Sequence, residues 1–449
     1  MKKLERRAFL CLCIAACLVL GLGFFVYEYV TDGHDWATYA ANQHIYSNGN
    51  LKTGAIYDCD GKLLAKNTKK GIKYNDDEGI RRATVHTVGD RERSISNSAE
   101  TVFQDKLVGY NLLTGVYSSK ERKINLTIDA DLCRTANDAL GRRYGTVGVY
   151  NYETGEIVCL VSSPNFDPEN PPQISADDTS GLYLNRFFSS AIVPGSIFKL
   201  VTTAAVIENV SGMEDWTYTC TGSESYGPDR ITCPSVHGTM DFYGALANSC
   251  NCAYAQLALS VGGKDLGKYV DEFKINESVD VNGIETARGS FKFPKEANAN
   301  LAWAGIGQYE DLINPCSYLR FIGAIAGGGQ AAEPRIIKST TNGFGMKHEY
   351  KAEMTSELID EDTAFQLQDM MKNNVEKTYG ESNFPGLDIY AKSGTAEVGG
   401  GRVPNSWFTG FIKNDDYPYA FIVLVENGGS GSQVAGSVAN TVLQAIVNE

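Results

Sequence analysis

The longest apolar run in the chain lies close to its N-terminus. Residues 8–30 read AFLCLCIAACLVLGLGFFVYEYV, and Glu28 is the only charged side chain among them. A helix of this length would extend about 34 Å, which is enough to cross a hydrocarbon core of about 30 Å. We therefore predict a transmembrane helix over residues 8–30, preceded by a short tail over residues 1–7.

The charges beside this run predict its orientation. Residues 1–7 carry four basic side chains and one acidic side chain, a net charge of +3. Basic residues before a span favour a cytoplasmic N-terminus, so we expect a single-pass protein of the cell membrane with its bulk outside the cytoplasm. No small-x-small cleavage site follows the run, which favours an uncleaved signal anchor. The alternative is a lipoprotein, because Ile14-Ala15-Ala16-Cys17 resembles a bacterial lipobox.

Residues 31–123 show short apolar groups among many polar and turn residues. Two short strands, around Ile56 and Leu64, flank the turn signal Asp60-Gly61. Helices are expected over residues 39–48 and 100–107. This pattern predicts a small, non-catalytic membrane-proximal module that docks a partner.

Residues 124–449 show stronger periodicity and predict one larger domain. A strand and a capped helix open it, two hairpins lie near its two ends, and an apolar helix closes it. The expected strands and helices are strand 125–128, helix 129–140, hairpins 146–162 and 407–426, helices 196–209 and 242–261, and helix 432–447. Strands at both ends with helices between them predict an α+β fold: one antiparallel sheet flanked by helices, with a helical region inserted.

Composition narrows the possible functions. Apolar residues make up 43% and charged residues 21%, as in a folded protein, and the net charge of −14 argues against a nucleic-acid partner.

The eleven cysteines divide by position. Cys11, Cys13 and Cys17 lie in the apolar run, and eight lie beyond it. Cys220 and Cys233 bracket a loop rich in turn residues, and a disulfide between them is slightly favoured over two reduced thiols. The Cys250/Cys252 spacing is not that of a zinc site, and the five histidines show no metal-binding spacing, so no metal or cofactor is expected.

Three polar groups interrupt apolar segments of the larger domain. Ser196 and Lys199 open an apolar helix, and their spacing places both on one face. A lysine on an apolar helix face loses preference for its charge and can take the proton of a serine nucleophile.

The second group is Ser249-Cys250-Asn251, whose hydroxyl and amide could relay a proton and hold a substrate carbonyl. The third is Lys392-Ser393-Gly394-Thr395, which follows a strand-like segment and suits a carboxylate.

S-x-x-K, S-x-N and K-[ST]-G in this order are the motifs of penicillin-binding proteins and serine β-lactamases. The chain resembles a monofunctional (class B) penicillin-binding protein, a peptidoglycan D,D-transpeptidase. The resemblance extends from Leu51 to the C-terminus through further landmarks. They are the stretch 53–65, Leu126-Thr127-Ile128-Asp129, Gly155-Glu156-Ile157-Val158 with Ser163-Pro164, Gly305-Ile306-Gly307-Gln308 and Trp407-Phe408-Thr409-Gly410-Phe411. Thr53 and Cys59 depart from the family's usual residues.

The resemblance implies a role for each motif. Ser196 would attack the D-Ala-D-Ala carbonyl of a stem peptide with Lys199 as base, while Ser249 would pass a proton and Asn251 would hold the substrate amide. The carboxylate would bind to Lys392, Ser393 and Thr395 on the strand that includes Gly394. Backbone N–H groups of Ser196 and Thr395 would form the oxyanion hole.

The resemblance also implies partners and alternatives. Expected ligands are peptidoglycan stem peptides and penicillin or other β-lactams, and the expected partner is a SEDS-type glycosyltransferase. A β-lactamase or a β-lactam sensor of the same fold is the alternative. A lactamase needs a deacylating base, and Glu296 with Asn300 matches that pattern poorly. The motifs leave open the cellular process, the third stem-peptide residue, the β-lactam affinity and the oligomeric state.

Overall fold

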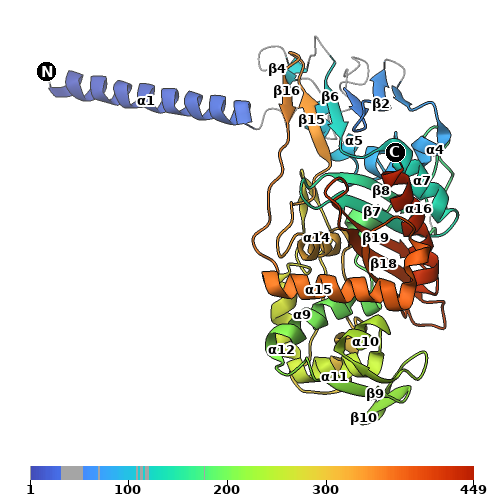
Figure 1. Ribbon diagram of the computed structural model, residues 1–449. Helices are drawn as coiled ribbons and strands as arrows, with labels where there is room; N and C mark the ends of the chain where they lie inside the picture. The colour runs from blue at the N-terminus through green and yellow to red at the C-terminus, as the bar shows by residue number, and fades with distance from the viewer. Residues whose placement is uncertain are drawn as a thin grey trace.

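The computed structural model describes residues 2–31, 54–68, 71–107, 110–111, 115–116, 121–175 and 177–448. Two sheets and a helical lobe lie one after another along the long axis of the protein (Figure 1). The predicted helix over residues 39–48 lies outside the described residues.

The first helix, α1 (Lys2–Thr31), includes the whole predicted span. Its stretch Lys2–Tyr29 is, within the described part of the chain, the only helix long and apolar enough to cross a membrane, and none of it is buried against the protein. A hydrophobic surface of this kind requires an apolar environment, so the helix is a candidate single membrane anchor.

A six-stranded sheet follows in the order β16-β15-β6-β1-β2-β3. Its β1 and β2 form the predicted hairpin, and β1 also pairs with β6 in parallel. The strands are β1 (Ala55–Tyr57), β2 (Leu63–Thr68), β3 (Gly71–Tyr74), β6 (Lys123–Leu126), β15 (Ile337–Thr341) and β16 (Lys347–Glu349). This sheet therefore combines strands from both sides of the predicted domain boundary at residues 123–124, and that boundary remains a prediction.

Short helices and one more pair of strands accompany this sheet. They are α4 (Glu78–Val88), α5 (Ala99–Val102), α6 (Gln104–Leu107), β4 (Tyr110–Asn111) and β5 (Gly115–Val116). Helix α4 packs on α7 (Ala130–Leu140), whose first turn is capped by the Asp129 carboxylate, as the sequence predicted.

The central sheet is five-stranded and antiparallel, in the order β17-β18-β19-β7-β8. Its strands are β7 (Gly145–Asn151), β8 (Ile157–Ser163), β17 (Ile389–Ala396), β18 (Asn405–Ile412) and β19 (Tyr419–Val425). Both predicted hairpins are present, and strands from the two ends of the domain meet where β19 pairs with β7. The predicted α+β fold is confirmed.

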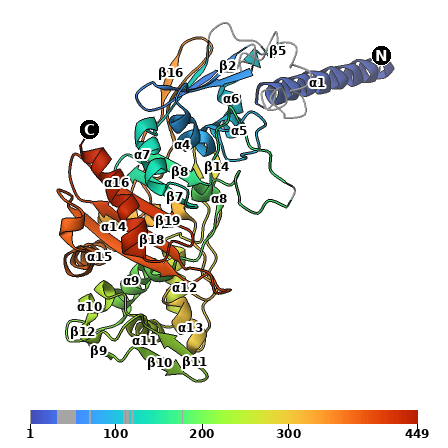
Figure 2. The ribbon, with the colours of Figure 1, turned by 90° about the vertical axis from the view of Figure 1, so that its right-hand side faces the viewer.

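Helices cover both faces of this sheet (Figure 2). Helices α7 and α16 (Gly436–Val447) pack together on one face, and α14 (Pro315–Ala326) and α15 (Glu361–Asn374) pack together on the other. Every residue of β18 is buried. The burial explains why its large apolar residues occupy consecutive positions, as in Trp407-Phe408 and Phe411-Ile412, rather than alternate ones.

The helical lobe is inserted between β8 and β17, as predicted. It contains α9 (Lys199–Asn209), α10 (Phe242–Ala247), α11 (Asn251–Val261), α12 (Gly263–Glu272) and α13 (Ala299–Ala304), with short strands β9 (Thr217–Cys220), β10 (Ser223–Tyr226), β11 (Asp229–Thr232) and β12 (Gly238–Asp241). Two smaller strands, β13 (Asp280–Val281) and β14 (Ile284–Glu285), and helix α8 (Arg186–Ser189) complete the described elements named here. The sheet edge β17 faces this lobe, and the three motifs meet at that junction.

Candidate active site

Ser196 and Lys199 lie at the start of α9. Ser196 belongs to a single 3₁₀ turn, Gly195–Phe198, and Lys199 is the first residue of the α-helix that continues it. The Lys199 Nζ lies 3.0 Å from the Ser196 Oγ. The sequence correctly placed the pair on one face, although the first turn is 3₁₀ rather than α.

The surroundings of Lys199 determine its protonation. Its side chain is completely buried, and burial lowers the pKa of Lys199 to about 7. The Nζ contacts two atoms that can only accept hydrogen bonds, the Ser249 carbonyl oxygen and the Asn251 Oδ1, each at 2.7 Å. A neutral amine has two N–H groups and one lone pair. With both N–H groups directed to these oxygens, the lone pair is left for the hydroxyl of Ser196.

The second motif lies in the turn between α10 and α11. Ser249 has a positive φ of 50°, a conformation unusual for a residue with a side chain. The Cys250 thiol caps α11 by accepting from the Ala253 N–H, and the Asn251 Nδ2 donates to the Thr232 carbonyl at 2.8 Å. These contacts hold the tight turn that directs Ser249 and Asn251 at Lys199.

The third motif lies within β17 rather than after it. Lys392 is fully buried, and its Nζ lies 3.0 Å from the Ser249 Oγ, which is also 3.2 Å from the Lys199 Nζ. The Ser249 hydroxyl therefore bridges two lysines. Burial, and secondarily the charge of Lys199, lowers the pKa of Lys392 well below its usual value.

Two glycines allow the three motifs to approach one another. Gly195 has φ 55°, and a Cβ there would lie 2.9 Å from the Ala396 Cα. A Cβ on Gly394 would lie 3.0 Å from a methyl group of Ile197. Any side chain at these positions would therefore separate β17 from the turn that carries Ser196.

The remaining predicted residues lie on the outer part of β17. Ser393 is half-buried and Thr395 is exposed, and alternation along the strand places both side chains on one face. A Cβ on Gly195 would lie 2.9 Å from the Thr395 carbonyl oxygen, so Thr395 adjoins the turn that carries Ser196. The structure thus brings all eight predicted site residues to one junction.

Sequence reasoning missed Tyr379. It ends the π-helical turn Val375–Tyr379 after α15, and its hydroxyl donates to the Ser393 Oγ at 3.0 Å and accepts from the Ser393 N–H at 2.8 Å. No motif includes this tyrosine, and only the fold brings it beside β17.

Gly307 supports the serine turn from behind. The Gly195 N–H donates to the Gly307 carbonyl at 2.8 Å, and a Cβ on Gly307 would lie 2.1 Å from the Gly195 oxygen. The Gly305-Ile306-Gly307-Gln308 stretch therefore has a structural role at the site.

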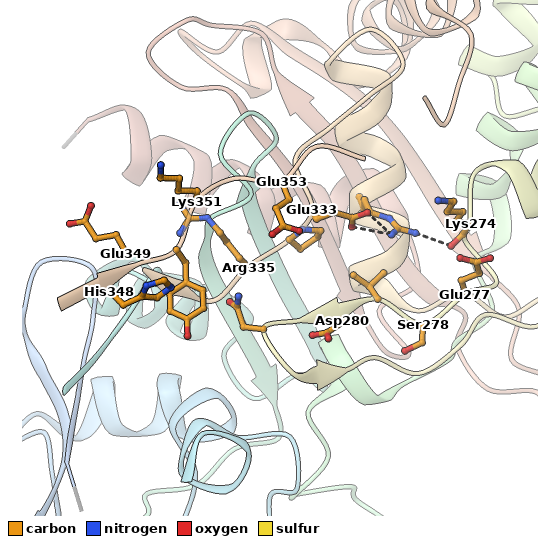
Figure 3. Close-up of a pocket in the computed structure, with 15 residues that line it drawn as sticks. Lys274, Glu277, Ser278, Asp280, Glu333, Arg335, His348, Glu349, Lys351 and Glu353 are labelled. Atoms are coloured by element: carbon orange, nitrogen blue, oxygen red, sulfur yellow. Dashed lines mark hydrogen bonds and ion pairs between the residues drawn. The ribbon is translucent and has the colours of Figure 1, made fainter. Parts of the chain in front are cut away.

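A separate cavity of about 830 Å³ lies elsewhere, beside α14 (Figure 3). Its charged residues pair with one another, as in the 3.1 Å contact between Arg320 and Glu333. None of the eight predicted site residues lines it, so we do not assign the chemistry to this cavity.

The described cysteines are all free. The disulfide between Cys220 and Cys233 that the sequence slightly favoured is not formed. The Cys233 thiol instead contacts the thiols of Cys250, at 3.6 Å, and Cys252, at 3.5 Å.

The fold and the serine–lysine junction define the class of protein. A family model described as "Penicillin binding protein transpeptidase domain" matches residues 145–447, which is well over half of the chain. The chain belongs to this family, and its class is that of the class B penicillin-binding proteins, as the sequence predicted.

Two curated relatives illustrate the similarity. The chain is 26% identical over 388 residues to peptidoglycan D,D-transpeptidase PbpA of Mycolicibacterium smegmatis, covering 79% of this chain and 78% of that protein. It is 27% identical over 315 residues to stage V sporulation protein D of Bacillus subtilis, covering 67% of this chain and 48% of that protein.

Solved structures share the fold. The crystal structure of PBPA from Mycobacterium tuberculosis has a TM-score of 0.77 at 22% identity, covering 88% of this chain and 99% of that one. The penicillin G acyl-enzyme complex of penicillin-binding protein A from the same organism matches with the same TM-score, identity and coverage.

Proposed function

We propose that this protein is a serine-type peptidoglycan D,D-transpeptidase. The observation that carries the proposal is the buried Lys199, whose amine meets the Ser196 hydroxyl at 3.0 Å while two acceptor oxygens occupy its other positions. This arrangement activates a serine for attack on a carbonyl. The names of the relatives, D,D-transpeptidases and penicillin acyl-enzymes, support this reaction class.

In the proposed reaction, Ser196 attacks the D-Ala-D-Ala carbonyl and Lys199 accepts its proton. The Ser249 hydroxyl, which lies between the two lysines, passes a proton to the nitrogen of the departing D-Ala. The amine of a neighbouring stem peptide then displaces Ser196 from the acyl-enzyme and forms the cross-link. A β-lactam would acylate the same serine.

The substrate is held by the remaining residues of the junction. Asn251 binds the stem-peptide amide, and Lys392, Ser393 and Thr395 bind the terminal carboxylate, with Gly394 giving the substrate access to the strand. The N–H groups of Ser196 and Thr395 stabilise the oxyanion, at about 3 kcal/mol per donor.

The anchor and the membrane-proximal module complete the proposal. Helix α1 would hold the protein in the membrane with residues 1–7 in the cytoplasm, because those residues carry the positive charge. The module over residues 31–123 would dock a SEDS-type glycosyltransferase that supplies the glycan strand.

The test uses the full-length protein in detergent and a fluorescent penicillin. We expect wild type and Ser260→Ala, a change on the exposed face of α11, to become covalently labelled. Ser196→Ala should remain unlabelled, and labelling that persists in this variant would refute the assignment of the nucleophile.

Adduct lifetime and cross-linking separate the alternatives. A transpeptidase should keep its label and cross-link lipid-linked stem peptides. Rapid loss of the label would indicate a β-lactamase, although Glu296 and Asn300, the candidate deacylating pair, are both exposed. A lasting label without cross-linking would indicate a sensor.

A further inference from the structure

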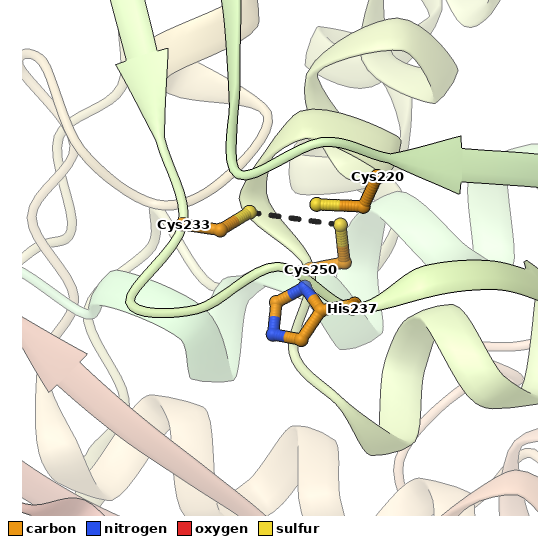
Figure 4. Close-up of side chains that lie close together, drawn as sticks. All are labelled: Cys220, Cys233, His237 and Cys250. Atoms are coloured by element: carbon orange, nitrogen blue, oxygen red, sulfur yellow. Dashed lines mark hydrogen bonds between the residues drawn. The ribbon is translucent and has the colours of Figure 1, made fainter.

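Three thiols and an imidazole gather beside the S-x-N motif. Cys220 ends β9, Cys233 follows β11, His237 precedes β12, and Cys250 caps α11. One ligand atom from each of the four lies within 4.8 Å of all the others. In Figure 4 the four side chains converge on a common point from separate segments of the lobe.

The distances fit a metal better than a disulfide. The Cys233 and Cys250 sulfurs are 3.6 Å apart, whereas a disulfide bond measures about 2.05 Å. Two thiolates on one tetrahedral Zn²⁺ lie about 3.8 Å apart, because each Zn–S bond is about 2.3 Å long.

The imidazole gives an independent indication of a ligand. The Nδ1 of His237 is buried and, among the described residues, has no hydrogen-bond partner. A buried ring nitrogen without a partner is unfavourable unless something binds it. Cys220 and Cys250 are also almost fully buried and Cys233 and His237 are half-buried, so much of the group is shielded from solvent, as in structural zinc sites.

We propose that Cys220, Cys233, Cys250 and His237 bind one Zn²⁺ as a tetrahedral structural site. Three thiols and one imidazole are a ligand set that zinc prefers, and binding would release the three thiol protons to solvent. The neighbouring Cys252 lies outside the four-residue group, although its thiol is 3.5 Å from that of Cys233, and it donates to the Ile231 carbonyl at 3.7 Å. The sequence predicted no metal, because its argument considered the Cys250/Cys252 spacing, whereas the ligands come from three separate segments.

The zinc site would position the turn between α10 and α11, which carries Ser249 and Asn251. Cys250 stands between Ser249 and Asn251, and Cys233 follows Thr232, whose carbonyl accepts the hydrogen bond of Asn251. A metal joining Cys250 to Cys233 would therefore fix the turn to the end of β11 at a second point. This would hold Ser249 at its positive φ and keep the two acceptor oxygens on Lys199. The metal site stands independently of the proposed reaction, and only its effect on acylation rests on the proposed function.

The first experiment measures metal content. Full-length protein is purified in detergent without added metal or reductant, and its zinc content is measured by inductively coupled plasma mass spectrometry. We expect about one zinc per chain in wild type and less than a tenth of that in Cys233→Ser. The matched control is Cys59→Ser, because Cys59 with Asp60 and Asp129 is the other possible metal-binding group among the described residues. This control should retain its zinc.

The second experiment measures what the metal does. Removal of zinc by a chelator should lower the melting temperature and slow acylation by fluorescent penicillin at least tenfold. Zn²⁺ should restore both, and Mg²⁺ should restore neither.

Four results would overturn the proposal, and three of them concern the proposed ligands directly. They are wild type without zinc, Cys233→Ser with the zinc content of wild type, and a native mass 2 Da low that maps to a Cys220–Cys233 bridge. Zinc that is lost in Cys59→Ser would place the metal at the other group and would equally refute this site. Zinc at one per chain in a protein that penicillin does not label would leave the metal site standing and reject the proposed reaction.

Discussion

Lys199 combines complete burial with four polar contacts around a single nitrogen. Burial disfavours its charged form, and the acceptor oxygens of Ser249 and Asn251 direct the lone pair toward Ser196. The pKa of Lys392 is lowered by its own burial and, secondarily, by the charge of Lys199. The site therefore contains a base that is ready near neutral pH.

The rate of acylation should depend on the protonation of Lys199. Its pKa is lowered to about 7, so the neutral form dominates above that pH and disappears below it. We expect the second-order rate constant for penicillin acylation to rise from pH 5.5 to about 7.5 and then level off. Lys199→Arg, which stays protonated, should reduce the rate by about 10²–10⁴-fold at every pH. Stopped-flow or gel-based labelling measures both, and a flat wild-type profile would contradict the assignment of the base.

Tyr379 should position Ser393 through its two hydrogen bonds. Tyr379→Phe removes one hydroxyl from a buried site, which costs about 1–2 kcal/mol and should lower the acylation rate constant about tenfold. The loss should appear as a weaker apparent affinity for penicillin, while the pH midpoint of acylation should stay the same. Tyr390→Phe, on the strand β17 that also carries Ser393 but near Asp388, is the control and should behave as wild type.

At the scale of elements, β17 depends on β18 for its position. Gly410 of β18 lies opposite Ala391, and a Cβ on Gly410 would lie only 1.9 Å from the Tyr390 carbonyl oxygen. The two strands can pair at this point only because position 410 has no side chain. Lys392, the lysine proposed to bind the substrate carboxylate, lies one residue further along β17.

Gly410→Ala should therefore push β17 away from β18. We expect the free energy of unfolding to fall by about 1–3 kcal/mol, as for other overpacked sites, and penicillin labelling to slow. Gly267→Ala in α12 is the matched control, since its Cβ would meet nothing closer than 3.7 Å. Thermal unfolding followed by circular dichroism measures the change. Equal melting temperatures for the two variants would show that the strands tolerate the methyl group.

Local patterns predicted most elements and the chemistry but not every long-range contact. The hairpins, the Asp129 cap and the three motifs could be read from the sequence because each depends on residues close together in the chain. The pairing of β6 with β15 joins residues about 214 positions apart, and no periodicity indicates such a partner. Tyr379 and the cluster of Cys220, Cys233, His237 and Cys250 were missed for the same reason, since only the fold brings these residues and their partners together.

At the scale of the whole molecule, the six-stranded sheet and the central sheet share none of the strands that the structure describes and are joined by contacts between their neighbouring elements. Helix α4 contacts α7 and β8, and the Thr127 hydroxyl, just after β6, donates to the Ile157 carbonyl of β8 at 2.7 Å. Helix α5 contributes Glu100, a carboxyl group almost completely enclosed, which contacts Asn67 of β2 at 3.3 Å. Burial raises the pKa of Glu100 to about 7 from its ordinary 4.5.

The stability of the protein should therefore depend on pH through Glu100. Between about pH 4.5 and 7 the folded state binds more protons than the unfolded state, so the stability contributed by this group falls as pH rises. Glu100→Gln should remove that loss and stabilise the protein by about 2–3 kcal/mol at pH 8, with little difference below pH 4.5. Thermal unfolding across pH measures it, with the exposed Glu92→Gln as control. Stability curves of wild type and Glu100→Gln that run parallel across pH would contradict the prediction.

The position of β6 between β1 and β15 has a consequence for any shortened version of the protein. A chain cut to begin at residue 124 would lose β1 and would turn β6 from an interior strand into an edge. Its backbone N–H and C=O groups would then be free to pair with the same edge of another molecule, the usual route to aggregation. Strand β1 thus covers the edge of β6. A soluble form should therefore retain residue 54 onward rather than start at residue 124.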